Sequence, residues 1–568
     1  MAAGEFTGQT VQEAKGKIRE SLIQSGQALS YAEPEGVVVS RSGDECVVAL
    51  TDQWYISYGE DEWKTTVNNH LKNMEFYSSD TRARFETALD WLSEWSCSRA
   101  FGLGTKLPWD PSVVIESLSD STMYMAFYTI AHLLQENPKL EASQISDEDL
   151  DFIFLGGSLP DVSHVGVELL SKLRNEFQYW YPVDLRVSGR DLIQNHLTFY
   201  LYTHAAMFPE EHWPKSIRTN GHVMLNNAKM SKGTGNFLTL RQAVEEYSAD
   251  AIRFALAYAG ESNEDANFEQ SIANAAILKL TAEIQLVEKM FDENLGLTDK
   301  LRKKHLLDLI FQNDVRRHME ACEHFYEKHV FRDAFIRAWD MLQNARDRYR
   351  AMLGDGNLHD ELMRMFIESQ TIAVSPVCPH YAEHVWSLLG NSDSVMNAKW
   401  PALGGVNATL SRMSDYMDKV LPDIRTAAER AKKKGAIKSA KVYTAHKFLD
   451  WQEATLSILA GQAQKDGEFG KEFKKKIMSM PEIKAFRSVS KKIMPFAQFC
   501  IDDYARRGAE AFELRVPFDE GHVWGACASY VRAELGIDSV EVLKWQPELM
   551  AESKIAPPVP GRPAFVFD

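Results

Sequence analysis

A run of residues that could bind phosphate occurs at positions 229–236, which read Lys-Met-Ser-Lys-Gly-Thr-Gly-Asn. Two lysines three residues apart, in a loop rich in Gly and Ser, can fold over a triphosphate. Each ammonium neutralises phosphate charge, and free backbone N–H groups add donors. A bare Lys-x-x-Lys is more often a chance pair in a polar surface loop. Here the whole string lies between a candidate strand and a candidate helix, so the sequence favours a phosphate-binding loop.

The elements on either side of this loop are predicted from pattern. Residues 217–225 form a candidate strand, which is closed by the turn-forming residues Asn226 and Asn227. After the loop, Thr239 and Gln242 have the spacing of a capping box, which predicts that a helix begins just after the cap. Strands that alternate with helices indicate an α/β layer structure in this part of the chain.

A second candidate strand, residues 182–189, alternates apolar and polar residues and ends in Gly189. A Gly at the carboxyl end of a strand lets a ligand approach the backbone, and the carboxylate of Asp191 could accept hydrogen bonds from ribose hydroxyls. Asn195 lies four residues after Asp191, so a helix would place both on one face. For His196, the sequence leaves open whether it binds a ligand or is a hydrogen-bonded structural residue.

The string at 229–236 resembles the KMSKS signature of class I aminoacyl-tRNA synthetases, in which this loop stabilises ATP during formation of an aminoacyl-adenylate. Lys229 and Lys232 fall on the two lysines of the signature, with Ser231 between them. Gly233 stands where the family usually has Ser, which removes a hydroxyl but keeps a backbone N–H and adds flexibility. The resemblance implies that Lys229, Ser231 and Lys232 are catalytic residues.

Other stretches resemble the same family and imply further site residues. Gly221 and His222 precede the loop, where relatives have a strand whose backbone reads the adenine. By position, Gly189 and Asp191 match the glycine and the acidic residue that hold the ATP ribose. The residues implied to bind ATP are Gly189, Asp191, Asn195, Gly221, His222, Val223 and Met230. The residues implied to line the amino-acid pocket are Leu118 and His196.

Residues 115–124, 195–199 and 260–269 look more like the cytosolic, archaeal/eukaryotic-type leucyl-tRNA synthetases than the valyl, isoleucyl or methionyl enzymes. This choice depends on resemblance, because apolar pockets that differ by one methylene discriminate by only about 1–3 kcal/mol. It implies activation of leucine with ATP, transfer to tRNA(Leu), and Mg²⁺ bound with the ATP. No structural metal is expected.

The family's other ATP motif, His-x-Gly-His, is not found, since the nearest string at residues 164–167 lacks the second His. We therefore expect the carboxy-terminal half of a synthetase, without the first half of the nucleotide fold and most of the editing domain. Because this family holds ATP from two sides, the isolated chain is expected to be inactive. Two alternatives stay open: a catalytically inactive tRNA-binding fragment, or one subunit of a split synthetase that joins the missing amino-terminal half or a multi-synthetase assembly.

The net charge of −17 conceals a basic segment. Between residues 421 and 510, Lys and Arg outnumber Asp and Glu by 19 to 11. Clustered basic charge is typical of proteins that bind a phosphate backbone, although a solvated helix face gives the same pattern. The candidate contacts to tRNA are Lys432, Lys433, Lys434, Lys438 and Lys441.

Composition and pattern indicate a soluble protein of several domains. The sequence contains no run of eighteen apolar residues, so no membrane span is predicted. Its six cysteines are scattered and form no Cys-x-x-Cys pair, which favours a reducing compartment such as the cytoplasm. The predicted fold is α/β plus all-α, in four segments. These are a remnant after the editing insertion (1–55), the second half of a Rossmann-type nucleotide-binding catalytic domain with the KMSKS-type loop (56–270), an α-helical anticodon-binding bundle (271–405), and a small α+β C-terminal domain that contacts tRNA (406–568).

Overall fold

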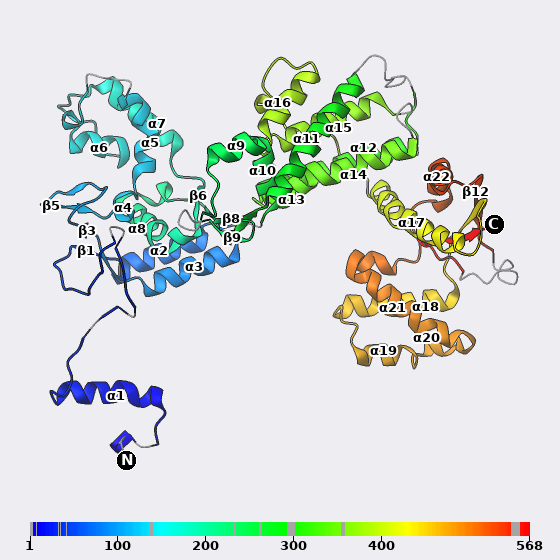
Figure 1. Ribbon diagram of the computed structural model, residues 1–568, viewed down its shortest axis with the longest axis horizontal. Coiled ribbons are helices and arrows are strands. Elements are labelled where there is room, and N and C mark those ends of the chain that lie inside the picture. The colour runs from blue at the N-terminus through cyan, green and yellow to red at the C-terminus, as the bar shows by residue number, and fades with distance from the viewer. Residues whose placement is uncertain are drawn as a thin grey trace. The chain divides into compact units, whose positions relative to one another are not determined.

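The computed structural model describes every residue except 1–3, 7, 32, 35, 41–42, 136–139, 231–234, 261–263, 292–301, 354–357 and 547–556. The described residues fold as two units (Figure 1). Unit 1 contains Met1–Glu75, Arg82–Arg186 and Leu192–Ser216, and unit 2 contains Phe76–Thr81, Val187–Asp191 and Ile217–Asp568.

Unit 1 is mostly helical, with short antiparallel strands. Its helices are α1 (Val11–Gln24), α2 (Asp61–Asn73), most of α3 (Ser79–Trp91), α4 (Ser117–Asp120), α5 (Tyr124–Gln135), α6 (Asp147–Phe154), α7 (Val167–Trp180) and α8 (Thr198–Met207). Its strands are β1 (Tyr55–Ser57), β2 (Glu94–Ser96), β3 (Ser98–Arg99), β4 (Lys106–Leu107) and β5 (Asp110–Ile115). β1 pairs with β2, and β5 lies between β3 and β4.

Two aromatic clusters stabilise unit 1. Helices α5, α6 and α7 pack around Phe177, whose ring lies 5.0 Å from Phe154 and 4.6 Å from Tyr181 between centroids. In the second cluster, the ring of Phe199 on α8 stacks on Tyr58 at 4.9 Å. Aromatic side chains bury large areas, so these contacts fix α8 and the turn that precedes it.

Five short strands surround the candidate loop. They are β6 (Arg186–Gly189), β7 (Ile217–Asn220), β8 (Val223–Leu225), β9 (Ala228–Lys229) and β10 (Ala266–Phe268). β8 is a middle strand, parallel to β10 and antiparallel to β9, and β6 pairs with β7. Among the described residues, these strands form two small sheets and not one continuous parallel sheet, so the finer prediction of a Rossmann half stays a prediction.

The prediction of one strand over residues 217–225 is wrong, because the strand is interrupted at Gly221 and divides into β7 and β8. This glycine lies so close to Glu264 that a Cβ atom would come within 2.4 Å of the Glu264 carbonyl oxygen. The local backbone therefore turns between β7 and β8. The pattern of residues 217–225 alone could not predict this contact, because Glu264 lies more than forty positions later in the sequence.

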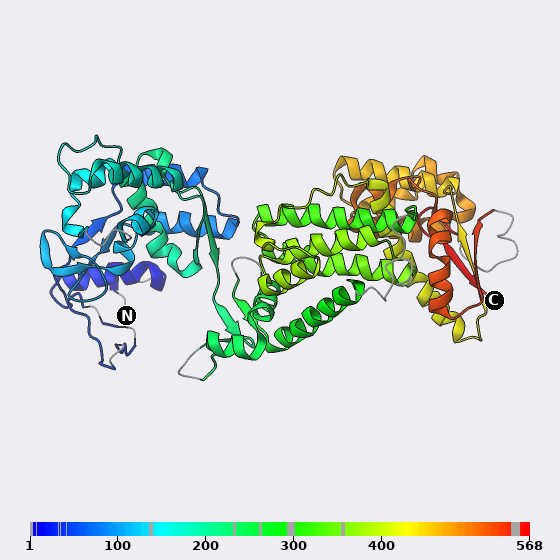
Figure 2. The ribbon, with the colours of Figure 1, turned by 90° about the horizontal axis from the view of Figure 1, so that it is seen from above.

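The predicted change from strands to helices after residue 270 is seen, with α9 and α10 lying between β9 and β10 and the other helices following β10. The helices are α9 (Leu240–Tyr247), α10 (Ala249–Tyr258), α11 (Gln270–Phe291), α12 (Leu306–Glu327), α13 (Phe331–Ile336), α14 (Leu342–Leu353), α15 (Asp360–Val374) and α16 (Pro379–Leu388). Helix α12 packs against α13, α14 and α15, and Figure 2 shows the long green helices lying side by side. Helices α11–α16 share one hydrophobic core, and we refer to them as the bundle.

The last part of unit 2 contains a three-stranded sheet and two groups of helices. Its elements are α17 (Ala408–Lys432), β11 (Ser439–Thr444), α18 (Asp450–Lys465), α19 (Lys471–Ile477), α20 (Pro481–Lys484), α21 (Ser490–Arg507), α22 (Glu520–Leu535), β12 (Ser539–Lys544) and β13 (Ala564–Phe567). β11 is the central strand, parallel to β12 and antiparallel to β13. No helix among the described residues has the length and apolarity that crossing a membrane requires.

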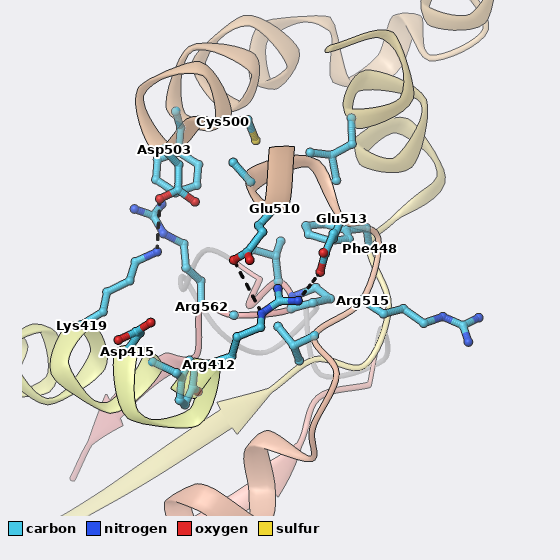
Figure 3. A pocket seen from close by; sticks show the side chains of 18 of the residues that line it. Arg412, Asp415, Lys419, Phe448, Cys500, Asp503, Glu510, Glu513, Arg515 and Arg562 are labelled. Carbon is cyan, nitrogen blue, oxygen red and sulfur yellow. Dashed lines mark ion pairs between the residues drawn. The ribbon is translucent and has the colours of Figure 1, made fainter. Parts of the chain in front are cut away.

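A hollow lies between α17, α21 and the turn before β13, and charged residues meet across it (Figure 3). Arg412 contacts Glu513 at 2.6 Å and Glu510 at 3.8 Å, and Lys419 lies 3.8 Å from Asp503. These ion pairs join α17 to the helical group α18–α21. None of the site residues predicted from the sequence lines this hollow.

Candidate functional site

A tight hairpin carries Lys229 at the beginning of the candidate loop. Asn226 and Asn227 join β8 to β9 with positive φ angles of 48° and 63°. Two-residue hairpin turns of this kind require positive φ at both positions, which Asn tolerates. The N–H of Asn227 donates to Asn267 Oδ1 on β10 at 2.6 Å, which fixes the hairpin to the sheet. The predicted turn is confirmed.

Both ends of the loop are anchored. Met230, at its beginning, and Leu238, just after its end, pack against the same core as the bundle. The side chain of Asn236 donates to the backbone carbonyl of Lys229 at 3.3 Å, so the ends are also joined to each other.

The predicted catalytic residues do not all fall in the described part of the chain. Ser231 and Lys232 lie outside the described residues. Lys229 is described, and its side chain is exposed beside the hairpin. An exposed ammonium group at this position can meet an incoming anion without first losing a buried partner.

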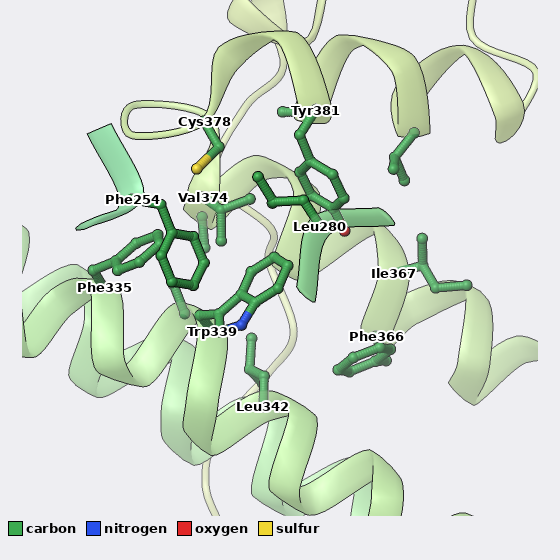
Figure 4. Close-up of a cluster of buried hydrophobic side chains, with 14 of the residues drawn as sticks. Phe254, Leu280, Phe335, Trp339, Leu342, Phe366, Ile367, Val374, Cys378 and Tyr381 are labelled. Atoms are coloured by element: carbon green, nitrogen blue, oxygen red, sulfur yellow. The ribbon is translucent and has the colours of Figure 1, made fainter. Parts of the chain in front are cut away.

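The helix after the loop begins at the predicted cap. Thr239 Oγ1 accepts from the N–H of Gln242 at 3.3 Å, and Gln242 Oε1 accepts from the N–H of Thr239 at 3.2 Å, so the capping box is confirmed. Helix α10 follows and places Phe254 in the bundle core, 5.3 Å from Trp339 between ring centroids (Figure 4). The downstream end of the loop is thereby fixed to the bundle.

Two of the predicted ATP-binding turns meet through Asp265. Its Oδ1 accepts from Arg190 Nη2 at 2.7 Å and from the backbone N–H of His222 at 2.9 Å. The backbone hydrogen bond from His222 is the main reason that the pKa of Asp265 is lowered, and Arg190 adds to it. The carboxylate is therefore ionised at neutral pH, and the backbone donor of His222 is already used within the protein.

The turn after β6 has the form expected of a ligand-facing glycine. A Cβ atom on Gly189 would lie 2.7 Å from Asp191 Oδ1, so only Gly lets the carboxylate fold back over the backbone. Asp191 is exposed, as are His222 and Val223 near the beginning of β8. Within unit 2, the structure thus brings the Gly189–Asp191 turn and the Gly221–His222 turn together.

The predicted amino-acid pocket lies in unit 1. His196 is buried, and its Nδ1 lies 3.2 Å from the carbonyl oxygen of Leu118 and 3.3 Å from Ser121 Oγ. Its Nε2 lies 3.4 Å from Arg186 Nη2, and its ring is parallel to that of Tyr124. The structure therefore brings the two predicted pocket residues, His196 and Leu118, into contact.

The environment of His196 favours the neutral ring. Burial lowers the pKa of His196, and the positive charge of Arg186 lowers it further. Since a carbonyl oxygen only accepts, Nδ1 carries the proton and donates to Leu118, which leaves Nε2 as an acceptor toward Arg186. Both ring nitrogens of His196 therefore have partners within unit 1, and its place in an amino-acid pocket stays a prediction.

The prediction that Asp191 and Asn195 share one helix face is wrong. Residues Arg190–Leu192 form a 3₁₀ turn and Ile193–Leu197 a π-helical turn, so the i, i+4 spacing of an α-helix does not apply. The two residues also belong to different units. Asn195 instead accepts from the N–H of His196 through its side-chain oxygen at 2.6 Å.

The five lysines predicted to contact tRNA lie around the end of α17 and on β11. Lys433, Lys434 and Lys438 are exposed. Lys432 Nζ donates to the carbonyl oxygen of Leu535 at 3.0 Å, and Lys441 Nζ pairs with Asp568 at 3.0 Å. Lys432 and Lys441 thus already have partners within the fold, and the contact of the five lysines with tRNA stays a prediction.

Asp265 was not predicted as a site residue, although it lies in the stretch 260–269. It has no local signal, because its partners Arg190 and His222 are 75 and 43 positions away in the sequence.

Among the described residues, no three His, Cys, Asp or Glu side chains gather to hold a metal ion.

Three family models match consecutive parts of the chain. Residues 24–269 match "tRNA synthetases class I (I, L, M and V)", and residues 309–444 match "Anticodon-binding domain of tRNA ligase". Residues 444–517 match "Leucine--tRNA ligase, RagD-binding domain". The first model contains the loop, and the second contains most of the bundle.

Curated relatives align with the whole chain. It is 40% identical to the cytoplasmic leucine--tRNA ligase of Arabidopsis thaliana and 41% identical to that of Pongo abelii, and it covers 55% and 50% of those proteins. The corresponding enzyme of Dictyostelium discoideum is 40% identical, and the chain covers 55% of it. The chain thus spans about half the length of the curated relatives it matches. Among solved structures, Mycobacterium tuberculosis methionyl-tRNA synthetase bound by methionyl-adenylate aligns at 16% identity over 64% of this chain and 68% of its own, with a TM-score of 0.47.

Proposed function

The chain belongs to the class I aminoacyl-tRNA synthetase family, and from that premise we propose that it provides part of a cytoplasmic leucine--tRNA ligase. In this proposal, leucine reacts with ATP to form leucyl-adenylate, and the leucyl group is then transferred to tRNA(Leu). The observation that carries the proposal is the Lys229 hairpin with both loop ends anchored, inside a segment that matches the class I model.

The proposed role of each unit 2 residue follows from its chemistry. Lys229 and Lys232 neutralise the charge that develops on the phosphates as pyrophosphate leaves, with Ser231 and Met230 completing the loop. Asp191 accepts from the ribose hydroxyls above Gly189. Mg²⁺ bound with the ATP would offset part of the triphosphate charge.

The adenine and the leucine have separate proposed contacts. The backbone near Gly221 and Val223 reads the adenine edge, while the N–H of His222 stays bonded to Asp265. In unit 1, Leu118 and the neutral His196 line the pocket for the leucine side chain. We propose that β8 and β10 belong to the parallel sheet of the nucleotide-binding fold.

The test is leucine-dependent ATP–pyrophosphate exchange, measured for the chain alone and for the completed enzyme. The completed enzyme means this chain co-expressed with the segment of a cytoplasmic leucine--tRNA ligase that it does not span. We expect exchange in the completed enzyme, because ATP must be positioned from two sides. The alternative is a catalytically inactive tRNA-binding module, which predicts tRNA binding without exchange in either sample.

We propose that the basic residues around the end of α17 bind the tRNA backbone. Replacing Lys433, Lys434 and Lys438 together by Ala is expected to weaken tRNA binding. It should also flatten the plot of log affinity against log salt concentration, by about one unit of slope for each phosphate group that is no longer neutralised. The measurement is a fluorescence titration with labelled tRNA(Leu) at several salt concentrations.

The comparison for this experiment is a triple variant on α19. Lys471, Lys475 and Lys476 are equally exposed but lie outside the predicted contact. Their replacement by Ala is expected to leave the salt slope unchanged. If instead the α19 variant lowers the slope and the α17 variant does not, the proposed contact is wrong and the basic surface on α19 binds the tRNA.

Residues 444–517 have a separate proposed role. Their helices α18–α21 form a hydrophobic core of their own, so they can present a surface to another protein. The family model that matches them is named for binding RagD. We propose that this helical group binds a protein partner in the cytoplasm, in addition to the tRNA contact at α17.

A further inference from the structure

The two proposed nucleotide-binding turns of unit 2 are held by one carboxylate. Asp265 Oδ1 accepts from the guanidinium of Arg190, which stands between Gly189 and Asp191, and from the backbone N–H of His222, which follows Gly221. Both turns are distant from Asp265 in the sequence, by 75 and 43 positions. Its single oxygen atom therefore sets the distance between the ribose turn and the adenine turn.

The backbone next to Asp265 strengthens this connection. The N–H of Ala266 donates to the carbonyl oxygen of His222 at 2.9 Å, so both backbone groups of His222 are bonded to residues 265–266. Gly221 lies against the same segment, since a Cβ atom there would be 2.4 Å from the carbonyl oxygen of Glu264 and 2.7 Å from Asp265 Oδ1. Only glycine allows this close approach.

The position of the cluster also agrees with a role beside a ligand. The side chains of Arg190 and Asp265 are 29% and 31% exposed, so the cluster lies at the surface of unit 2 and not in its core. A surface ion pair by itself contributes little to stability. A carboxylate that also accepts a backbone N–H is useful mainly for holding two turns in one geometry.

We infer that Asp265 is a positioning residue for ATP, which acts through Arg190 and the backbone of His222. This inference rests on the proposed function, because it takes the two turns as the ribose and adenine contacts. Asp265 does not touch the reacting atoms in this scheme. It keeps Asp191 and the backbone near Gly221 at the spacing that one nucleoside requires.

The experiment compares Asp265→Ala and Asp265→Asn in the completed enzyme. Removing the carboxylate breaks the link between the two turns, and we expect the KM for ATP and the Kd for ATP to rise by about 10-fold or more, as for other residues that orient ligand-binding groups. The KM for leucine should change by less than about 2-fold, because the leucine pocket is in unit 1. Asp265→Asn keeps an oxygen that accepts from His222 but loses the charge facing Arg190, so an intermediate effect is expected.

The matched control is Glu534→Ala. Glu534 pairs with Arg425 in the same unit and its side chain is 30% exposed, close to the value for Asp265. It is expected to leave both ATP constants unchanged. Thermal unfolding of each variant checks that the fold is intact. If Asp265→Ala is too unstable, the ATP constants are measured on Asp265→Asn instead.

The readouts separate this inference from the proposed function. Calorimetric titration with ATP measures binding without any reaction. If the wild-type assembly shows no leucine-dependent exchange but Asp265→Ala still weakens ATP binding, the proposed function fails and the positioning role stands. If exchange is normal and the ATP constants of Asp265→Ala equal those of Glu534→Ala, the positioning role is overturned. A parallel rise in the KM for leucine and for ATP also overturns it.

Discussion

Replacing Lys232 by Ala in the completed enzyme is expected to lower kcat for leucine-dependent ATP–pyrophosphate exchange by about 10²–10³-fold, the usual loss when one group that stabilises transition-state charge is removed. Lys229→Ala is expected to act in the same direction. Each ammonium is proposed to meet negative charge that develops as pyrophosphate leaves, so the loss should appear in kcat and less in the KM for leucine.

A lysine away from the loop provides the control for this prediction. Lys289 is exposed on α11 of the same unit and has no proposed contact with ATP. Lys289→Ala should exchange at the wild-type rate. The proposed role of the loop would be refuted if both loop variants stayed within about 3-fold of wild type under the same conditions.

Arg346→Ala is expected to destabilise the bundle by about 3–5 kcal/mol, because it leaves a buried carboxylate without its counter-charge. Arg346 pairs with Glu283 across α14 and α11, and their side chains are 6% and 5% exposed. Gln343 donates to the same carboxylate at 3.0 Å, but as a neutral group it cannot replace the charge. The measurement is chemical denaturation followed by circular dichroism.

The pH dependence of the variant gives an independent check. Burial raises the pKa of Glu283 even with Arg346 present. A group whose folded pKa is raised favours folding below its unfolded pKa, and this contribution is lost as pH rises through the folded value. The stability lost in Arg346→Ala should therefore partly return as the pH is lowered from neutral through the raised pKa of Glu283, because the carboxyl group then becomes neutral.

Two further variants test whether the loss of stability comes from the unpaired buried charge. The double replacement Glu283→Met with Arg346→Met should recover most of the stability, since an apolar pair of similar volume leaves no buried charge. Lys475→Ala removes an exposed ion pair with Glu472 and should cause no measurable change. Equal stability of Arg346→Ala and wild type at pH 7 would contradict the account.

Local signals in the sequence predicted local structure well. The Asn226–Asn227 turn and the Thr239–Gln242 capping box are each specified by residues a few positions apart, and both are confirmed. The apolar patterns after residue 270 predicted helices for the same reason, because the periodicity of a helix is visible within one segment.

Contacts between distant segments were not predictable in this way. The approach of Gly221 to Glu264 breaks the expected strand, and the bond between Arg190 and Asp265 joins two turns from separate motifs. The partners of Lys432 and Lys441, which are Leu535 and Asp568, were also not predicted. A charge count cannot distinguish such partnered lysines from exposed ones.

The family resemblance supplied what pattern could not, namely the choice of leucine and the pairing of His196 with Leu118. The structure places these two residues in contact, but selectivity for leucine depends on small differences in pocket shape. The identity of the amino acid therefore stays a proposal that kinetics must decide.

The most direct test of the account is leucine-dependent ATP–pyrophosphate exchange by the completed enzyme, with isoleucine, valine and methionine as competing substrates. The account predicts exchange that requires both polypeptides and that is fastest with leucine. No exchange with any of these amino acids, in a sample that still binds tRNA(Leu), would contradict it and would favour a tRNA-binding module without catalysis.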